Sequence, residues 1–336
     1  MPKYYPSVLV ATVLCLGVGW AAWKQIDWIS VDGKGKLTSL DSQPWNESES
    51  AALPVEVISD PLTSVVRIPF TLTESNNISI PVVINGKDSL NLMFHTAVDS
   101  ISLTAEAVEK MQTLDTSGSV DVKSWGGTGK SAVSTGNRLQ IGELEWSEQT
   151  IFVNELSGPG TDGKFGPHLF AHKILEINFD NRELVLHAAV PKAATDATSK
   201  YQRLDISQKR DSMYVDGELT VGDSKYTNPL MIHSGFGGTV LLDDSFVATH
   251  KIASKLETIS ERELKDSFGN ILKTKRVKLS SLTIGGIRFF DIPIEIFDGA
   301  IGNQKVSVLG GDLLKTLNLL IDAEHHPIYI SPSTRQ

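Results

Sequence analysis

The feature of this sequence that most constrains its fold is an internal repeat. Residues 92–97 (LMFHTA) resemble residues 230–235 (LMIHSG), and their histidines lie 233 − 95 = 138 positions apart. Residues 139–142 (LQIG) and 282–285 (LTIG) repeat at a separation of 282 − 139 = 143. Matched segments at nearly constant separation predict two halves with the same architecture.

Two more landmarks keep the same order in both halves. The segments 162–166 (DGKFG) and 306–310 (VSVLG) end on glycines that are 310 − 166 = 144 residues apart. Residues 174–180 (ILEINFD) close the first half, as residues 317–322 (LNLLID) close the second. The alanine- and threonine-rich residues 188–199 between the halves are interpreted as a connector.

Strand signals dominate both halves. Residues 65–70, 78–84 and 90–94 are short runs rich in β-branched and apolar residues, and Asn85-Gly86 is a strong hairpin signal. Short helices are expected at three places only, which are residues 104–114, 245–256 and 313–317. The sequence therefore predicts an all-β protein with few helices.

Composition and charge restrict the function. Of its 336 residues, 40% are hydrophobic and 21% charged, as in ordinary globular proteins. The length favours two domains, or one domain built from two halves. The formal net charge of −9 argues against a nucleic-acid partner, since phosphate binding favours a basic surface. Cys15 is the single cysteine, so neither an internal disulfide nor a cysteine zinc cluster can form.

The N-terminal 29 residues predict membrane association. Residues 7–23 carry no charge, and Trp20, Trp23 and Trp28 follow at the end where indole rings favour the interface. An uncleaved anchor is the preferred interpretation, and a cleaved secretory signal is the alternative. Residues 30–60 are polar and are expected to form a flexible tether. The soluble part is then expected outside the cytoplasm, periplasmic or extracellular, and secreted if cleavage occurs.

The repeated landmarks resemble the aspartic protease superfamily, specifically two-lobed proteins with retropepsin-like halves. The resemblance covers residues 78–330. Each lobe of that family has a strand ending in apolar-apolar-Asp-Thr/Ser-Gly, then an apolar-Gly segment, a short helix and a closing hairpin with an aspartate. Here the later features are similar to Phe165-Gly166 and Leu309-Gly310, helices at 167–174 and 312–317, and turns at Asp180 and Asp322. The resemblance implies bilobed acid-protease-like β-barrels at 61–190 and 191–336, with a cleft between them.

The chemistry departs from the family pattern. The two aspartates of the family align with His95 and His233. The loop residues that follow are Thr96 and Ala97 in the first lobe, where the family has glycine at the second position. They are Ser234 and Gly235 in the second lobe.

This substitution weighs against aspartic catalysis. The family dyad consists of two carboxyl groups that share one proton. A neutral imidazole offers one donor and one acceptor, and an imidazolium offers donors only, so two imidazoles cannot reproduce that dyad. The leading hypothesis is a catalytically inactive module that binds an extended peptide or a partner protein in the cleft. The alternatives are an active peptidase, of aspartic type or assisted by histidine, and a metal-binding protein that uses His95 and His233 as weak ligands.

A glycine-rich segment lies between His95 and the apolar-Gly segment Phe165-Gly166 of the first half. In the family a hairpin at this place covers the cleft, so Trp125, Gly126 and Gly127 are candidates for a binding flap. Other glycine runs match neither a P-loop nor a dinucleotide motif. No cofactor is predicted.

Overall fold

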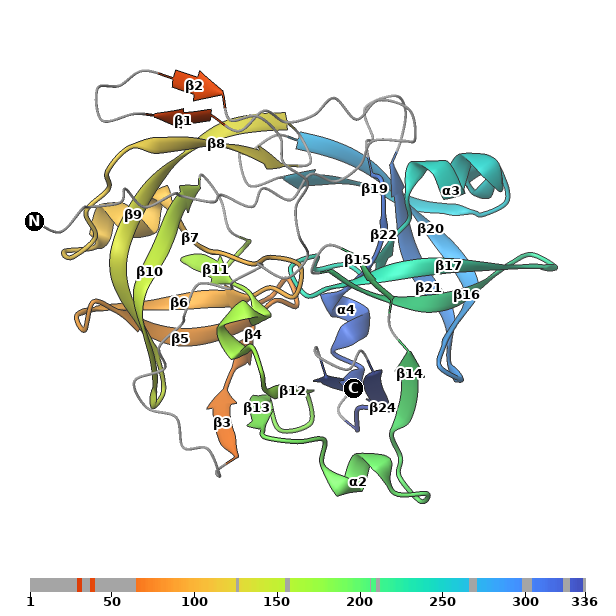
Figure 1. The fold of residues 1–336 in the computed structure, drawn as a ribbon. Coiled ribbons are helices and arrows are strands. Elements are labelled where there is room, and N and C mark those ends of the chain that lie inside the picture. Colours follow the sequence, from red (N-terminus) through yellow and green to blue (C-terminus); the bar gives the residue numbers. More distant parts are fainter. Residues whose placement is uncertain are drawn as a thin grey trace, which may run out of the picture.

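The computed structural model describes residues 65–124, 127–154, 158–205, 207–209, 212–265, 271–297, 304–322 and 327–334, with the backbone of 29–31 and 37–39. These residues form an all-β protein with two barrels and a third sheet (Figure 1). In this part of the chain no helix has the length and apolar character needed to span a bilayer. The expected anchor lies outside it, and the expected tether contributes the two paired strands β1 (Ile29–Val31) and β2 (Leu37–Ser39).

The first barrel is a sheet closed upon itself. The sheet order is β4-β5-β6-β11-β7-β10-β9-β8, and pairing of β5 with β9 closes a ring of the six inner strands. The strands are β4 (Thr71–Leu72), β5 (Ile78–Ile84), β6 (Asp88–Phe94), β7 (Ile101–Thr104), β8 (Ser119–Ser124), β9 (Gly127–Ile141), β10 (Leu144–Asn154) and β11 (Gly163–Phe165).

The second barrel repeats this order strand for strand, as β15-β16-β17-β22-β18-β21-β20-β19 with a closing pair β16–β20. The strands are β15 (Ser207–Lys209), β16 (Ser212–Val221), β17 (Ser224–His233), β18 (Val240–Leu241), β19 (Thr258–Lys265), β20 (Ile271–Ile284), β21 (Ile287–Phe297) and β22 (Ser307–Gly310). The internal repeat seen in the sequence is thus a repeat of topology.

Local sequence explains the hairpin of β5 and β6 and the inward side chains of the first barrel. Asn85 (φ 52°) and Gly86 (φ 70°) both take left-handed backbone angles, which a two-residue hairpin turn requires, and they join β5 to β6. In β5 the side chains of Ile80, Val82 and Ile84 alternate inward and are at most 3% exposed. The barrel core also contains aromatic rings, each of which stabilises the fold by roughly 1.5–3 kcal/mol through burial; the largest are Trp146, Phe94 and Phe165.

A six-stranded sheet joins the two lobes and lies at the bottom of Figure 1. Its order is β14-β24-β23-β12-β13-β3, so the strands on either side of its centre come from different lobes. Ile177 of β12 pairs with Leu319 of β23 at this centre. The strands are β3 (Val66–Pro69), β12 (Ile174–Asn178), β13 (Glu183–His187), β14 (Gln202–Asp205), β23 (Leu317–Asp322) and β24 (Pro327–Pro332).

Helices are few and short, as expected. They are α1 (Ala105–Lys110), α2 (Lys192–Thr195) in the connector, α3 (Asp244–Thr249) and α4 (Gly311–Leu314), with 3₁₀ turns η1 (Pro167–Phe170) and η2 (Ile252–Ser254). The Thr104 hydroxyl caps α1 by accepting the N–H of Ala107 at 3.1 Å.

The helices expected at 167–174 and 312–317 are shorter than predicted. Ile174 and Leu317 instead begin strands β12 and β23. These strands pair with each other across the lobes, and this non-local pairing outweighs the local helical preference.

Candidate functional site

Two histidines meet where the equivalent loops of the two lobes come together. His95 directly follows β6, and its N–H donates to the carbonyl of Phe165 at 2.9 Å. His233 is the last residue of β17 and pairs with Gly310 of β22. Their ring centroids are 4.5 Å apart with an interplanar angle of 57°. Both side chains are buried, at 7% and 8% exposure. The structure therefore brings together the two histidines that the repeat singled out.

The residues that follow the histidines bind each other reciprocally. The N–H of Thr96 donates to the Ser234 hydroxyl at 3.0 Å, and the N–H of Ser234 donates to the Thr96 hydroxyl at 3.0 Å. The Thr96 hydroxyl donates to the carbonyl of Ile232 at 2.8 Å, and the Ser234 hydroxyl donates to that of Phe94 at 2.7 Å. These four buried hydrogen bonds cross between the lobes and fix the two loops against each other.

A turn of the first lobe supports the second-lobe loop. Asn77 is 1% exposed and donates its side-chain N–H to the carbonyl of Ser234 at 3.1 Å. Its neighbour Asn76 donates to the carbonyl of Gly237 at 3.2 Å. Sequence reasoning missed Asn77, because an asparagine next to a turn carries no local signal of a contact 157 residues away.

The hydrogen bond of His95 assigns its neutral tautomer. The N–H of Ala97 donates to His95 Nδ1 at 3.1 Å, so Nδ1 carries the lone pair. In the neutral ring the proton then lies on Nε2, which is a hydrogen-bond donor.

Both imidazoles are held neutral at pH 7. Burial lowers the pKa of His95 well below its usual value, and repulsion from a protonated His233 and from Lys164 lowers it further. Burial likewise lowers the pKa of His233 to about 4, with a further contribution from Lys164. The common physical cause is that a buried imidazolium loses its hydration, and the Lys164 ammonium repels a second positive charge.

Ala97 and Gly235, which stand at equivalent positions, have different surroundings. A Cβ atom at Gly235 would lie 2.3 Å from His95 Nε2, so the ring of His95 occupies the place of a side chain there. Ala97 packs against an apolar cluster of the second lobe that contains Tyr214, Met231 and Phe236. The loss of glycine in the first loop is therefore compatible with this packing.

The predicted binding flap is described only in part. Strands β8 and β9 form an antiparallel hairpin in which Ser124 pairs with Gly127. Trp125 and Gly126 lie outside the described residues. Among the residues that are described, no group of three or more His, Cys, Asp or Glu side chains is arranged to hold a metal ion.

One charged residue near the pair was not predicted as part of a site. Lys164 belongs to the landmark 162–166, which sequence analysis used only to align the halves. Its position between Gly163 and Phe165 in a strand places it on the face opposite the buried Phe165. That alternation was the signal available from the sequence.

The fold is that of an acid-protease-like protein: two equivalent β-barrels, few short helices and a shared sheet. No known family model and no curated protein matches the sequence. Among solved structures, the crystal structure of aspartic proteinase from Irpex lacteus is similar, with a TM-score of 0.55. The identity is 13%, and the match covers 81% of this chain and 98% of that chain. At this identity the likeness shows the fold.

Proposed function

We propose that this chain is a catalytically silent protein with the aspartic proteinase fold, and that it binds an extended peptide or protein segment between its lobes. In this proposal His95 and His233 stand where aspartic proteinases carry their two aspartates. The observation that supports it most directly is the contact of two neutral imidazoles, with centroids 4.5 Å apart, at the meeting point of the two equivalent loops.

The chemistry of the histidine pair explains the proposed lack of aspartic protease activity. Aspartic catalysis needs one carboxylate to take a proton from water while a carboxylic acid donates toward the substrate carbonyl. His95 Nδ1 already accepts the N–H of Ala97, so this ring offers only a donor to a ligand. Neither imidazole can share a proton within an anionic pair, so the proton transfer between carboxyl groups and water that defines aspartic catalysis has no equivalent.

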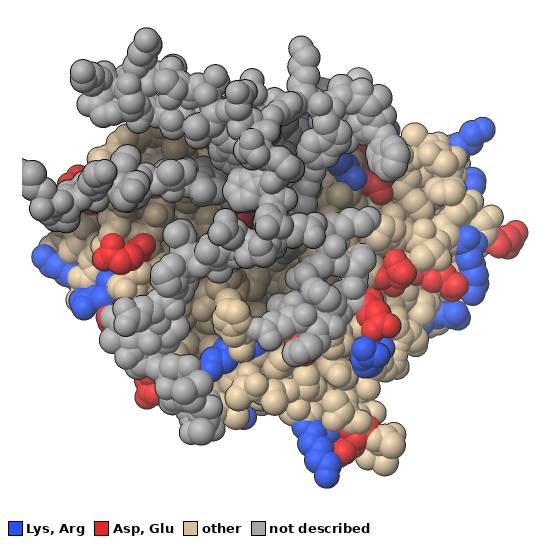
Figure 2. Space-filling model, in the orientation of Figure 1, with Lys and Arg blue, Asp and Glu red and all other residues tan. Residues whose placement is uncertain are grey.

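Peptide binding follows from the kind of surface that the fold provides. Strands β8 and β19 each lie at one end of a barrel sheet, and an extended peptide can add to such an edge through main-chain hydrogen bonds. A nucleic acid is disfavoured by the net charge of −9. On the described surface in Figure 2, acidic and basic side chains are interspersed rather than gathered into one basic field.

The N-terminal segment completes the proposal. Residues 1–29 would anchor the chain, and residues 30–60 would hold the body away from the membrane, outside the cytoplasm. Protease protection of the body in intact cells or spheroplasts, compared with a chain that lacks residues 1–29, tests this arrangement.

The decisive experiment restores the carboxyl dyad. Wild-type protein is expected to leave denatured casein uncleaved at acid pH, whereas the double variant His95→Asp/His233→Asp is expected to gain cleavage that pepstatin abolishes. The control is His95→Asn/His233→Asn, which has a similar size but no acid, and circular dichroism verifies that each variant folds. Pepstatin-sensitive cleavage by the wild type would overturn the proposal in favour of an active peptidase.

A further inference from the structure

We propose that Lys164, Ser102 and the Nε2–H of His95 form a carboxylate-binding subsite on the first lobe. The proposal rests on the proposed peptide-binding function and deepens it, because it names an acidic group as part of the preferred ligand. The carboxylate is either the side chain of Asp or Glu or the C-terminus of the bound segment.

Strand pairing places the three residues on one face of the sheet. Lys164 of β11 pairs with Met93 of β6 on one side and with Ser102 of β7 on the other. Directly paired residues present their side chains on the same face of a sheet. Phe94 and Phe165, the next residues along, point into the barrel core, so Lys164 and Ser102 lie on the opposite face. His95 follows Phe94 and returns to this face.

The charge of Lys164 acts on both histidines. It contributes to the lowered pKa of His95 and of His233. This agrees with the strand pairing, which puts Lys164 on the same face of the sheet as His95. Lys164 therefore adds a positive contribution at the pair, although the whole chain carries a net charge of −9.

Ser102 provides a second observation that points to a ligand. The residue is 2% exposed, and among the described residues its hydroxyl oxygen has no hydrogen-bond partner. A buried hydroxyl without a partner destabilises the protein, and a ligand that accepts a hydrogen bond from it removes this cost. Its neighbours Ile101 and Leu103 belong to the barrel core, so Ser102 faces the side of Lys164.

The second lobe serves as an internal comparison. Val308 pairs with Met231 there, as Lys164 pairs with Met93 in the first lobe. Leu241 pairs with Val308, as Ser102 pairs with Lys164. Equivalent positions thus carry an ammonium and a hydroxyl in one lobe and two fully buried apolar side chains in the other. The fold itself has no need of polar groups at these positions.

The chemistry of the three groups selects an anion with two acceptor oxygens. An ammonium, a hydroxyl and an imidazole N–H are all donors, and hydrogen bonds between a charged donor and a carboxylate are about twice as strong as neutral ones. A neutral amide offers one acceptor oxygen and no charge, so it is expected to bind more weakly at this subsite.

The experiment uses the full chain with isotope-labelled histidine and follows the imidazole resonances by NMR. The probes are N-acetylglutamate α-amide for a side-chain carboxylate and N-acetylglycine for a terminal one. The matched neutral probes are N-acetylglutamine amide and N-acetylglycinamide. Saturable shifts of the His95 and His233 resonances are expected with at least one carboxylate probe and with neither neutral probe, and the probe that binds identifies the source of the group.

Variants then test the named residues. Lys164→Met is expected to weaken carboxylate binding by about ten- to hundredfold, and Ser102→Ala by several-fold. The control Lys225→Met removes an exposed lysine that pairs with Glu218 in the other lobe, and it is expected to bind like the wild type. Unchanged carboxylate binding in Lys164→Met, or equal shifts with the neutral probes, would overturn the subsite.

Failure of the subsite and failure of the proposed function are distinguishable. Tight binding of neutral, amidated peptides that does not depend on Lys164 would leave the peptide-binding function intact and remove the subsite. Carboxylate probes that bind through Lys164 while no peptide binds would support the subsite and contradict the proposed function.

Discussion

Gly235 of the second lobe lies directly against the imidazole of His95 from the first lobe. An added Cβ would meet His95 Cδ2 at 2.2 Å and Nε2 at 2.3 Å, which is closer than such atoms approach. The backbone of the second lobe thus packs against the His95 ring of the first lobe and leaves no room for a side chain at position 235.

This contact predicts that Gly235→Ala moves the His95 ring and destabilises the protein. Overpacking of a buried site costs about 1–3 kcal/mol, so urea denaturation is expected to show a loss of that size. The matched variant is Ala97→Gly at the equivalent position, where the cost is the backbone entropy of glycine, about 0.5–1 kcal/mol, and the contact of one methyl group with the apolar cluster. Equal stability of Gly235→Ala and wild type would mean that the two loops are not packed as described.

The reciprocal bonds of Thr96 and Ser234 predict a coupled loss of stability. Thr96→Val leaves the Ser234 N–H and the Ile232 carbonyl without their partner, and Ser234→Ala does the same to the Thr96 N–H and the Phe94 carbonyl. Each variant is expected to lose about 1–3 kcal/mol of unfolding free energy. The two variants remove different bonds of one network between the same two loops, so loss of one pair is expected to weaken the other, and the double variant is expected to lose less than the sum. Strict additivity in this double-mutant cycle would argue against a shared network.

The buried histidines predict that stability falls between neutral and mildly acidic pH. Burial lowers the pKa of His95 well below 6.5 and lowers those of His168 and His233 to about 4. Below pH 6.5 the unfolded chain binds protons at these sites and the folded chain does not. The unfolding free energy therefore decreases as pH falls from 6.5 toward 4, by up to about 1.4 kcal/mol per pH unit for each histidine.

Urea denaturation at several pH values measures this slope. The variant His95→Gln/His233→Gln retains polar side chains but cannot titrate, so its slope is expected to be about one third of the wild-type slope, with His168 remaining. The carboxyl groups of Asp180 and Glu176, whose pKa values are lowered, lose their contribution only at more acidic pH. A wild-type stability that is constant from pH 7 to pH 5 would contradict the neutral, buried state of the pair.

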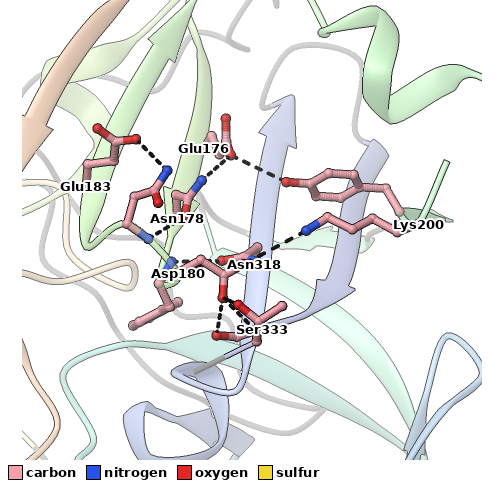
Figure 3. Close-up of polar contacts among 11 residues, drawn as sticks. Glu176, Asn178, Asp180, Glu183, Lys200, Asn318 and Ser333 are labelled. Carbon is pink, nitrogen blue, oxygen red and sulfur yellow. Dashed lines mark hydrogen bonds and ion pairs between the residues drawn. The ribbon is translucent and has the colours of Figure 1, made fainter. Parts of the chain in front are cut away.

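The hydrogen bonds of Asp180, which lies far from the histidines, predict a large loss of unfolding free energy when it is replaced (Figure 3). Its carboxylate accepts the Asn318 amide at 2.7 Å, the Ser333 hydroxyl at 2.8 Å, and the Thr334 N–H and hydroxyl at 2.6 and 2.9 Å. These bonds join the first closing hairpin to the second lobe and the end of the described chain. Asp180→Ala is expected to lose about 2–4 kcal/mol in urea denaturation and to speed hydrogen exchange at Thr334.

Asp205 provides the control for Asp180. Its side chain is 83% exposed and pairs with Arg203 at the surface. Asp205→Ala is expected to change stability by no more than about 0.5 kcal/mol, because exposed ion pairs contribute little. Similar losses in both variants would show that the Asp180 network adds nothing beyond an ordinary surface charge.

Local sequence signals predicted the parts of the fold that depend on local physics. Asn85-Gly86 predicted its hairpin because few residue pairs accept two left-handed angles, and Thr104 predicted the start of α1 because its hydroxyl caps the helix. The repeated segments around His95 and His233 predicted that the two residues are equivalent. Their contact then follows from the symmetry of the two lobes.

Features that depend on distant partners could not be predicted in this way. The pairing of Ile177 with Leu319 joins strands from different lobes, and both strands look like ordinary closing hairpins in the sequence. Lys164 looked like one charge in a turn-rich landmark. Its contrast with Val308 at the equivalent position of the second lobe appears only from the strand pairing. The tautomer of His95 depends on an N–H at 3.1 Å, which no sequence pattern encodes.

The shared sheet has a consequence for each lobe on its own. Pairing of β12 with β23 covers a strand edge that either half would otherwise expose to solvent. A first lobe produced alone would present β12 as a free edge with apolar neighbours, and a second copy of the same lobe has the complementary edge. Within this chain each lobe therefore covers the open edge of the other, as two subunits would at a shared interface.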